Sequence, residues 1–196
     1  MRRRRQRVLH GREQAAAWLI LGLSCLLTAC QPAQPLRVAS HVWVGYEPMF
    51  LARSLGWLDP SKVSLHETAS ATESMAALAQ GRVEAAALTL DEVLRLRDDG
   101  LDLAVVLIFN ISAGADALIA RPSLRTLADL RGARVGFEHG AVGELVILEA
   151  LRQAGLTLEE IVAVNLPADQ YVEAYDAGRV DALAAYEPSE IGRAHV

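Results

Sequence analysis

The chain has 196 residues, of which 52% are hydrophobic and 22% charged, so a folded core is expected and a disordered chain is excluded. The net charge of −5 hides an asymmetry, because residues 1–29 hold six Arg and one Glu and the remainder holds 13 Lys and Arg against 23 Asp and Glu. An acidic body excludes nucleic acid as the expected partner, since that partner requires a basic surface. Two cysteines are too few for a disulfide framework.

The first thirty residues have the pattern of a signal peptide. Five arginines within residues 2–7 precede an apolar stretch at 15–29, which is shorter than the roughly 20 residues needed to span a bilayer. The stretch ends in Leu27-Thr28-Ala29-Cys30, which resembles a bacterial lipobox. We therefore expect residues 1–30 to be a lipoprotein signal peptide, Cys30 to be lipidated, and residues 31–35 to be a short tether. An ordinary secretory signal or an uncleaved anchor is the alternative.

The last six residues form a second segment that we set aside. Residues 191–196, Ile-Gly-Arg-Ala-His-Val, look like the translation of a common sequencing adapter. We expect a non-native tail here and a chain that is a fragment ending near residue 190. A natural C-terminus is the alternative.

The body of the chain contains an internal repeat. A shift of 97 residues aligns similar short motifs, and each copy has the pattern strand, helix, strand, helix, strand. We therefore expect two lobes, residues 36–111 and a partial lobe at 112–190. The aligned segments are Arg37-Val38 with Arg134-Val135, Gly81–Ala85 with Gly178–Ala182, and Thr89 with Tyr186.

Hydrophobic periodicity and capping residues place the elements of both copies. Alternating strands and helices predict an α/β fold with parallel sheets covered on both faces, and ligands of such sheets bind beyond the carboxyl ends of the strands. The expected strands are Leu36–Val44, Val63–Thr68, Val83–Leu88, Leu103–Phe109, Arg134–Phe137, Ile161–Leu166 and Val180–Tyr186. The expected helices begin near Pro48, Ser70 and Thr89 and cover Gly143–Ala154 and Ala168–Ala177.

The loops after these strands supply the candidate ligand-binding residues, in a cleft between the lobes. Their aromatic rings are suited to stacking on a flat or cationic ligand, and core packing is the equal alternative. For the Ser and Thr residues the alternative role is helix capping, and for the Glu residues it is an exposed, solvated position. The candidates are Trp43, Gly45, Tyr46, Glu47, Ser70, Thr72, Thr89, His139, Gly140, Tyr186 and Glu187. Tyr171 is a further loop aromatic, whereas His41 and His66 are interpreted as structural strand residues.

The charge of these loops favours one ligand class. Glu47, Glu138 and Glu187 lie near strand ends. No Lys or Arg occurs in the six loops at the predicted strand ends, which are Trp43–Glu47, Ala69–Glu73, Thr89–Asp91, Glu138–Val142, Pro167–Gln170 and Tyr186–Pro188. This pattern favours a neutral or cationic nitrogenous ligand, although helix N-termini alone can hold an anion. The histidines lack a metal-ligand spacing, and the usual hydrolase, phosphate-loop and dinucleotide motifs are missing, so no metal or cofactor is expected.

Several segments resemble one family, the substrate-binding proteins grouped as SsuA/TauA/THI5-like, also called NMT1-like. They are Val44–Ala52 with Leu55-Gly56-Trp57, Gly81–Ala86, Leu127–Gly136 and Tyr186-Glu187-Pro188, together covering about residues 36–188. The resemblance implies a type II periplasmic binding protein fold with an incomplete second lobe. It also implies capture of a small nitrogenous, sulfonate or nitrate-like molecule for the permease of an ABC importer.

Two other functions compete with solute capture. Part of the family makes thiamine pyrimidine with a sacrificial histidine, but the matching segment Thr89–Val93 has no histidine, so we expect no enzyme. A sensor input domain of a signalling protein is the second alternative. With the export signal, the resemblance implies a monomer, lipid-anchored on the periplasmic or extracellular face of a bacterial membrane.

Overall fold

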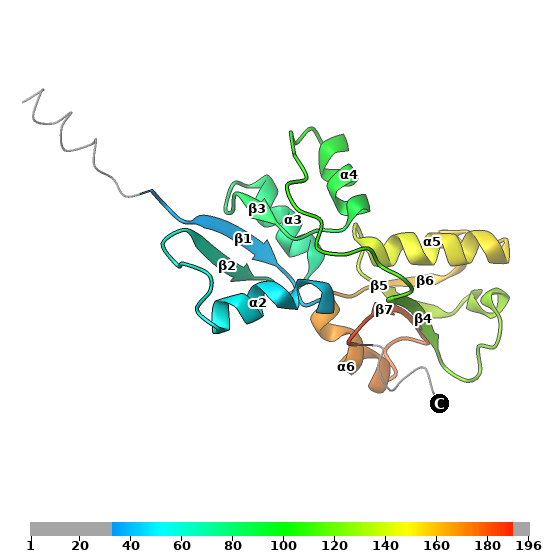
Figure 1. Cartoon of the computed structure of the whole chain (residues 1–196). Coiled ribbons are helices and arrows are strands. Elements are labelled where there is room, and N and C mark those ends of the chain that lie inside the picture. Colours follow the sequence, from blue (N-terminus) through cyan, green and yellow to red (C-terminus); the bar gives the residue numbers. More distant parts are fainter. Residues whose placement is uncertain (1–32, 190–196) are drawn as a thin grey trace, which may run out of the picture. The chain divides into compact units, whose positions relative to one another are not determined.

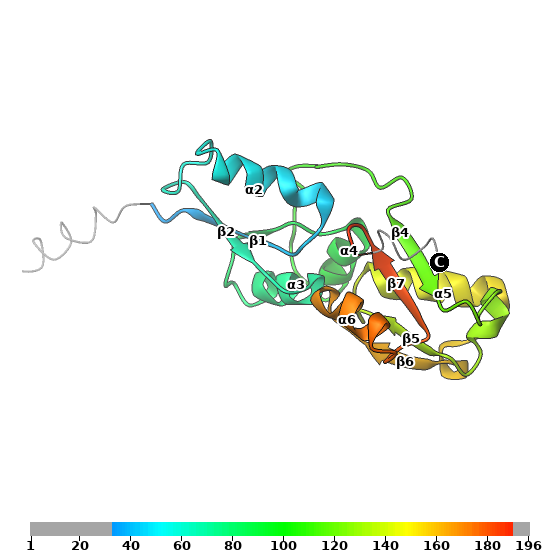
Figure 2. The same cartoon turned by 90° about the horizontal axis from the view of Figure 1, so that it is seen from below.

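The computed structural model describes residues 33–189, and from Pro35 onward these belong to one compact unit. The predictions of a signal peptide, a lipidated Cys30 and a non-native tail therefore lie outside the described residues, and the tether lies mostly outside them. Figures 1 and 2 show two groups of strands, each accompanied by helices. No helix among the described residues is long and apolar enough to cross a membrane.

The first sheet has three parallel strands in the order β2-β1-β3. The predicted alternation of strands and helices is confirmed here, but the first strand is shorter than predicted, since the chain leaves the sheet after Ser40 and turns into a short 3-10 helix. The elements are β1 (Leu36–Ser40), η1 (Val44–Tyr46), α2 (Glu47–Ser54), β2 (Val63–Glu67), α3 (Ala71–Ala79), β3 (Ala85–Ala86) and α4 (Leu90–Asp98).

The second sheet has four strands in the order β4-β7-β5-β6. Three are parallel as predicted, and the fourth, β4, is an unpredicted edge strand that runs antiparallel to β7. The elements are β4 (Asp116–Ala120), η2 (Leu127–Leu130), β5 (Arg134–Phe137), α5 (Val142–Ala154), η3 (Leu158–Glu160), β6 (Val162–Asn165), η4 (Ala168–Gln170), α6 (Tyr171–Asp176) and β7 (Ala182–Tyr186).

The internal repeat corresponds to one ion pair made twice. Arg37 at the start of β1 donates from its backbone N–H and its guanidinium to Glu84, just before β3. Arg134 at the start of β5 makes the same bonds to Asp181, just before β7. The first pair joins β1 to β3 and the second joins β5 to β7, which are equivalent neighbours in the two sheets. The 97-residue repeat therefore corresponds to equivalent positions in the two sheets.

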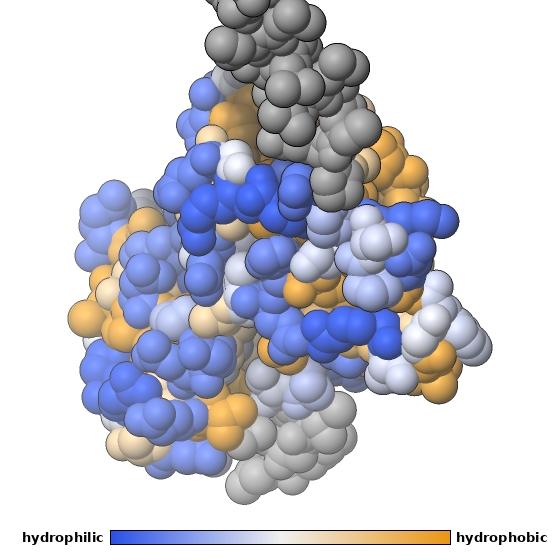
Figure 3. All heavy atoms as spheres, turned by 90° about the vertical axis from the view of Figure 1, so that its left-hand side faces the viewer, coloured by the Kyte–Doolittle hydropathy of each residue, from blue (hydrophilic) through white to orange (hydrophobic). Residues whose placement is uncertain are grey.

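The core is unevenly divided between the two sheets. The second sheet buries large apolar side chains, among them Val135, Phe137, Ile147 and Leu151. The buried cluster of the first sheet is small, with alanines and Val83 at its centre. Alanine removes little apolar surface from water, so burial stabilises the first sheet less. On the face that Figure 3 shows, most of the surface is hydrophilic and apolar residues form separate patches.

The prediction of a buried strand at Leu103–Phe109 is wrong. Residues 101–115 form an irregular connection from α4 to β4, and the side chains of Val106 and Ile108 are 89% and 72% exposed. The connection can be followed in green in Figures 1 and 2. Within the described residues, β3 pairs only with β1 and no strand pairs with this segment. Hydropathy predicted a buried strand, but a strand also needs a hydrogen-bonded neighbour.

We expect this connection to promote self-association. Replacing Val106 and Ile108 with Lys should lower light scattering of concentrated solutions severalfold and leave the melting temperature nearly unchanged, because exposed apolar segments associate and charges oppose this. Leu55→Lys, at an exposed apolar residue that caps the end of α2, is the matched control and should change scattering little. Equal scattering by the double variant and the unmodified chain would contradict this expectation.

Candidate functional site

The carboxyl ends of the two central strands lie close together. His41 follows β1 and Glu138 follows β5, and the two positions are equivalent in the 97-residue repeat. Both side chains are buried, and the Glu138 carboxylate acts electrostatically on the His41 ring. Parallel α/β sheets bind their ligands beyond the carboxyl ends of their strands, so His41 and Glu138 lie where a ligand site is expected.

Glu138 joins the two sheets through hydrogen bonds. Its Oε1 accepts from the backbone N–H of Thr72 at 2.7 Å and from the Thr72 hydroxyl at 2.5 Å. Thr72 lies in the first turn of α3, whose N-cap Ser70 accepts from the N–H of Glu73 and contacts the Thr72 hydroxyl at 3.0 Å. A carboxylate is favoured at a helix N-terminus, because free N–H groups and the helix dipole stabilise negative charge there.

Aromatic rings surround this contact. Tyr46 of η1 lies edge-on to His41 at 5.5 Å and to Trp43 at 4.8 Å between ring centroids. Tyr186, at the end of β7, lies 6.4 Å from His41 and 6.0 Å from Tyr171 of α6. The rings therefore come from both sheets and enclose the end of β1.

Two carboxylates of α4 complete the site. The Thr89 N–H donates to Glu92 Oε2 at 2.8 Å, and the Glu92 side chain is fully buried. Burial, with smaller contributions from the charges of Asp91 and Glu138, raises the pKa of Glu92 to about 7. Burial likewise lowers the pKa of His41 to about 4, so this ring is neutral at pH 7. Burial, and beyond it the nearby carboxylates, raise the pKa of the Tyr46 and Tyr171 hydroxyls.

We call this set the acidic–aromatic cluster: His41, Tyr46, Asp91, Glu92, Glu138, Tyr171 and Tyr186. Several of its buried polar atoms have no hydrogen-bond partner in the protein, namely His41 Nδ1, Asp91 Oδ2, Glu92 Oε1 and the Tyr186 hydroxyl. Buried polar atoms are nearly always hydrogen-bonded in folded proteins. Their concentration makes this cluster the candidate functional site.

The structure brings together part of the predicted set. Tyr46 and Tyr186 belong to the cluster, Thr72 bonds to it, and Trp43, Ser70 and Thr89 are adjacent to it through the contacts above. Gly45 is packed between the Trp43 ring and Asn110, whose side-chain amide donates to the Gly45 carbonyl. Gly140 has a φ of +84° and lies beside Thr72, and its N–H donates to Glu144.

Three predicted residues lie apart from the cluster. Glu47 is exposed in the first turn of α2. His139 is exposed and its ring lies 4.5 Å from that of Phe137. Glu187 is half-buried beyond β7, where its N–H donates to the Ala115 carbonyl. Their assignment to ligand binding stays a prediction.

Sequence reasoning missed most of the acidic part of the cluster. His41 was assigned to a strand interior but lies beyond the end of β1, because β1 stops at Ser40. Asp91 and Glu92 belong to the segment Thr89–Glu92, whose sequence is that of a capping box, and Glu92 does cap α4 through its other carboxylate oxygen. The available signal was positional, since Glu138 directly follows the predicted strand Arg134–Phe137 and His41 is its equivalent in the 97-residue repeat.

Two other possible sites contribute nothing to this one. An open apolar groove of about 390 Å³ lies between β4 and α5, where Leu118, Leu127 and Leu145 line it, and it contains none of the predicted residues. Among the described residues, no group of three or more His, Cys, Asp or Glu side chains is arranged to hold a metal ion.

Comparison with known proteins identifies the family. The family model described as NMT1/THI5 like matches residues 44–195, which is most of the chain. The chain belongs to the NMT1/THI5-like family. A curated Escherichia coli protein named for binding aliphatic sulfonates is 30% identical to this NMT1/THI5-like chain over 156 residues, which are 74% of this chain and 49% of that protein. The chain thus spans about half the length of this curated relative.

Solved structures show the fold of this NMT1/THI5-like chain. The alkanesulfonate-binding protein SsuA from Xanthomonas axonopodis pv. citri, bound to MOPS, superposes with a TM-score of 0.66 at 26% identity, over 82% of this chain and 56% of that protein. The nitrate-binding protein NrtA from Synechocystis superposes with a TM-score of 0.63 at 12% identity, over 80% of this chain and 47% of that protein. The expected α/β fold of type II periplasmic binding proteins is confirmed.

The raised pKa of Glu92 predicts a pH-dependent stability. The folded state binds this proton more tightly than the unfolded state, where the pKa is near 4.5, so its contribution is fully present below pH 4.5 and is lost as the pH rises to about 7. Glu92→Gln removes this loss. Relative to the unmodified chain, the variant should gain up to about 3 kcal/mol in free energy of unfolding between pH 4.5 and 7.5.

Urea unfolding followed by circular dichroism at several pH values measures this difference. The control is Glu149→Gln on α5, because Arg152 lowers the pKa of Glu149 to about 2 and its effect therefore falls below pH 4.5. His41 contributes the opposite slope between pH 4 and 6.5 in both proteins, so it cancels in the comparison. Parallel pH profiles of Glu92→Gln and the unmodified chain would refute a raised pKa at Glu92.

Proposed function

We propose that the chain is part of an extracytoplasmic solute-binding protein that captures a small organic molecule for the permease of an ABC importer. The observation that carries the proposal is the acidic–aromatic cluster, where two related sheets converge on buried polar atoms that lack protein partners. Relatives named for binding sulfonates and nitrate support solute capture and a periplasmic location. We propose further that the protein captures the solute as a monomer and without a cofactor.

Catalysis is not part of the proposal. The thiamine-pyrimidine alternative needs a sacrificial histidine in the helix after the third strand, and α4 contains none in Leu90–Asp98. His41 is neutral and its ring is enclosed by aromatic neighbours rather than by a nucleophile. The buried groups of the site are suited to recognition, because tyrosine rings and fixed hydrogen-bonding atoms orient a ligand.

Ligand capture can be tested at the Tyr186 hydroxyl. A library of small polar solutes, screened by thermal shift on the full chain, should give solutes that raise the melting temperature. Tyr186→Phe should weaken binding of such a solute about tenfold, because one hydrogen bond is lost. It should leave the free protein equally or more stable, since the hydroxyl has no protein partner.

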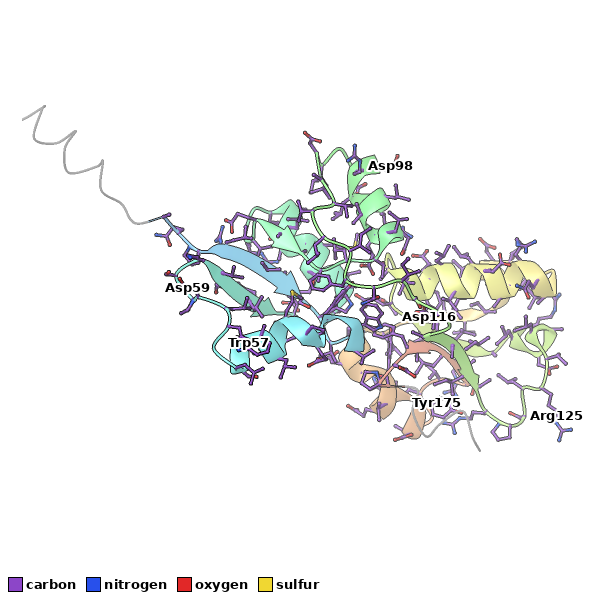
Figure 4. All side chains as sticks on the ribbon, in the orientation of Figure 1. Trp57, Asp59, Asp98, Asp116, Arg125 and Tyr175 are labelled. Atoms are coloured by element: carbon purple, nitrogen blue, oxygen red, sulfur yellow. The ribbon has the colours of Figure 1, made fainter. Side chains whose placement is uncertain are left out.

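Tyr175→Phe is the matched control for this experiment. Tyr175 lies on α6, one turn after Tyr171, and its ring faces the Arg121 guanidinium (Figure 4). Its hydroxyl is not among the buried atoms that lack a partner. This change should leave solute affinity unchanged. A solute library without any stabilising member, or an affinity insensitive to Tyr186→Phe, would count against capture at this site.

We also propose that Cys30 anchors the protein through a lipid. The support is the lipobox pattern Leu27-Thr28-Ala29-Cys30 after a short apolar stretch. In a bacterial host, Cys30→Ser should move the chain out of the membrane fraction, and mass spectrometry of the unmodified chain should find a diacylglyceryl adduct at Cys30. Cys25→Ser is the control and should have no effect. Recovery of mature protein with Met1–Cys30 intact would disprove lipidation.

A further inference from the structure

Negative charge is concentrated at the proposed site. Asp91 and Glu92 lie in the first turn of α4, and Glu138 follows β5. Asp116, which is labelled in Figure 4, begins β4. Asp91 acts electrostatically on Glu92 and on Asp116, and burial together with the Asp91 charge raises the pKa of Asp116. Four carboxylates from three segments therefore share one region, and two of them, Glu92 and Glu138, are buried.

Places that hold anions in other proteins are already occupied here. The N–H of Thr72 in the first turn of α3 donates to Glu138, and the N–H of the α4 N-cap Thr89 donates to Glu92. At α5, the Gly140 N–H donates to Glu144 at 2.6 Å. One N–H at or just before the start of each of α3, α4 and α5 thus donates to a carboxylate of the protein, and an anionic ligand would have to displace that carboxylate to use this N–H.

Positive side chains do not balance this charge. None of the ion pairs among the described residues includes a member of the acidic–aromatic cluster, and the charges acting on Tyr46, Glu92 and Tyr186 come from carboxylates and tyrosines. The cation nearest along α4 is Arg95, one turn beyond Asp91, which is partly exposed and pairs with Glu144 at 3.6 Å.

We propose that the ligand of this site is a small organic cation whose charged nitrogen lies between the carboxylates and the tyrosine rings of the acidic–aromatic cluster. This inference rests on the proposed solute capture and adds the charge class of the solute. Asp91 Oδ2 and Glu92 Oε1 are buried acceptors without partners, ready to receive N–H donors. Tyr46, Tyr171 and Tyr186 supply ring faces and edges, and a desolvated cation is attracted to aromatic faces.

An organic cation fits this arrangement better than a metal ion. The carboxylates of the described residues are spread over α4, β4 and the end of β5, and they do not converge as a metal-ligand set. An ammonium, amidinium or guanidinium group directs several N–H donors to separate acceptors, and its attached carbon skeleton can contact the rings. Spaced acceptors with aromatic neighbours suit such a group.

Matched pairs of ligands test the charge. Calorimetry of the full chain should compare butylammonium with butanesulfonate and benzamidinium with benzenesulfonate. We expect the cation of at least one pair to bind at least tenfold more tightly than its sulfonate partner. Asp91→Asn and Glu92→Gln should each weaken that cation at least tenfold, because a charged hydrogen bond is lost.

Asp98→Asn is the control for these variants. It makes the same change of charge at the opposite, exposed end of α4 (Figure 4), and it should leave cation affinity unchanged. Circular dichroism of each variant establishes that it is folded. Tighter binding of a sulfonate, or of neither charge class, overturns the cation inference. Solute capture itself is tested separately, by the thermal-shift screen of the solute library.

Proton release provides a readout that does not need a variant. Burial and the charges of Asp91 and Glu138 raise the pKa of Glu92 to about 7. The Glu92 carboxylate also acts electrostatically on the hydroxyls of Tyr46, Tyr171 and Tyr186. A cation bound beside it favours the ionised form, so binding should release protons at pH 7 and affinity should rise between pH 6 and 8. Proton uptake on binding, or affinity that falls over this range, contradicts the inference.

Discussion

The hydrogen bonds from Thr72 to Glu138 are the contact on which the arrangement of the site depends. A buried carboxylate is costly without partners, and Glu138 finds its partners in the first turn of a helix that belongs to the other sheet. The end of β5 is therefore held against the start of α3. The Glu138 charge also raises the pKa of His41, Tyr171 and Tyr186. One carboxylate therefore connects the two sheets and influences the protonation of the groups around it.

Much of the fold follows from the sequence because local and long-range signals agree. The motif that begins with Gly81 and its copy at Gly178 both precede the third parallel strand of a sheet. In both, the acidic residue pairs with an Arg of the first parallel strand. The strand predicted at Leu103–Phe109 failed because pairing is not encoded in the segment itself. β4 was missed because its five residues carry no turn or periodicity signal that distinguishes them, although they do find a pairing strand in β7.

The site was predictable by position but not by side-chain direction. Tyr46, Thr72 and Tyr186 were found because they follow strands or begin a helix. Glu92 was not found, because a capping glutamate uses one carboxylate oxygen locally and nothing in the sequence shows that the other is buried without a partner. Packing between the sheets determines which of several loop carboxylates is buried. Glu138 is buried by this packing, whereas Glu47 is exposed.

The antiparallel edge strand has a consequence for the order of events during synthesis. In β4, Ala120 pairs with Ala182 and Asp116 with Tyr186, across separations of 62 and 70 residues. β4 therefore leaves the ribosome long before its partner β7, and β5 likewise precedes β7, its neighbour in the sheet. The second sheet cannot assemble by stepwise addition from its N-terminal strand; β7 has to be inserted between strands made earlier, which favours late, concerted closure of this sheet and a slow folding step.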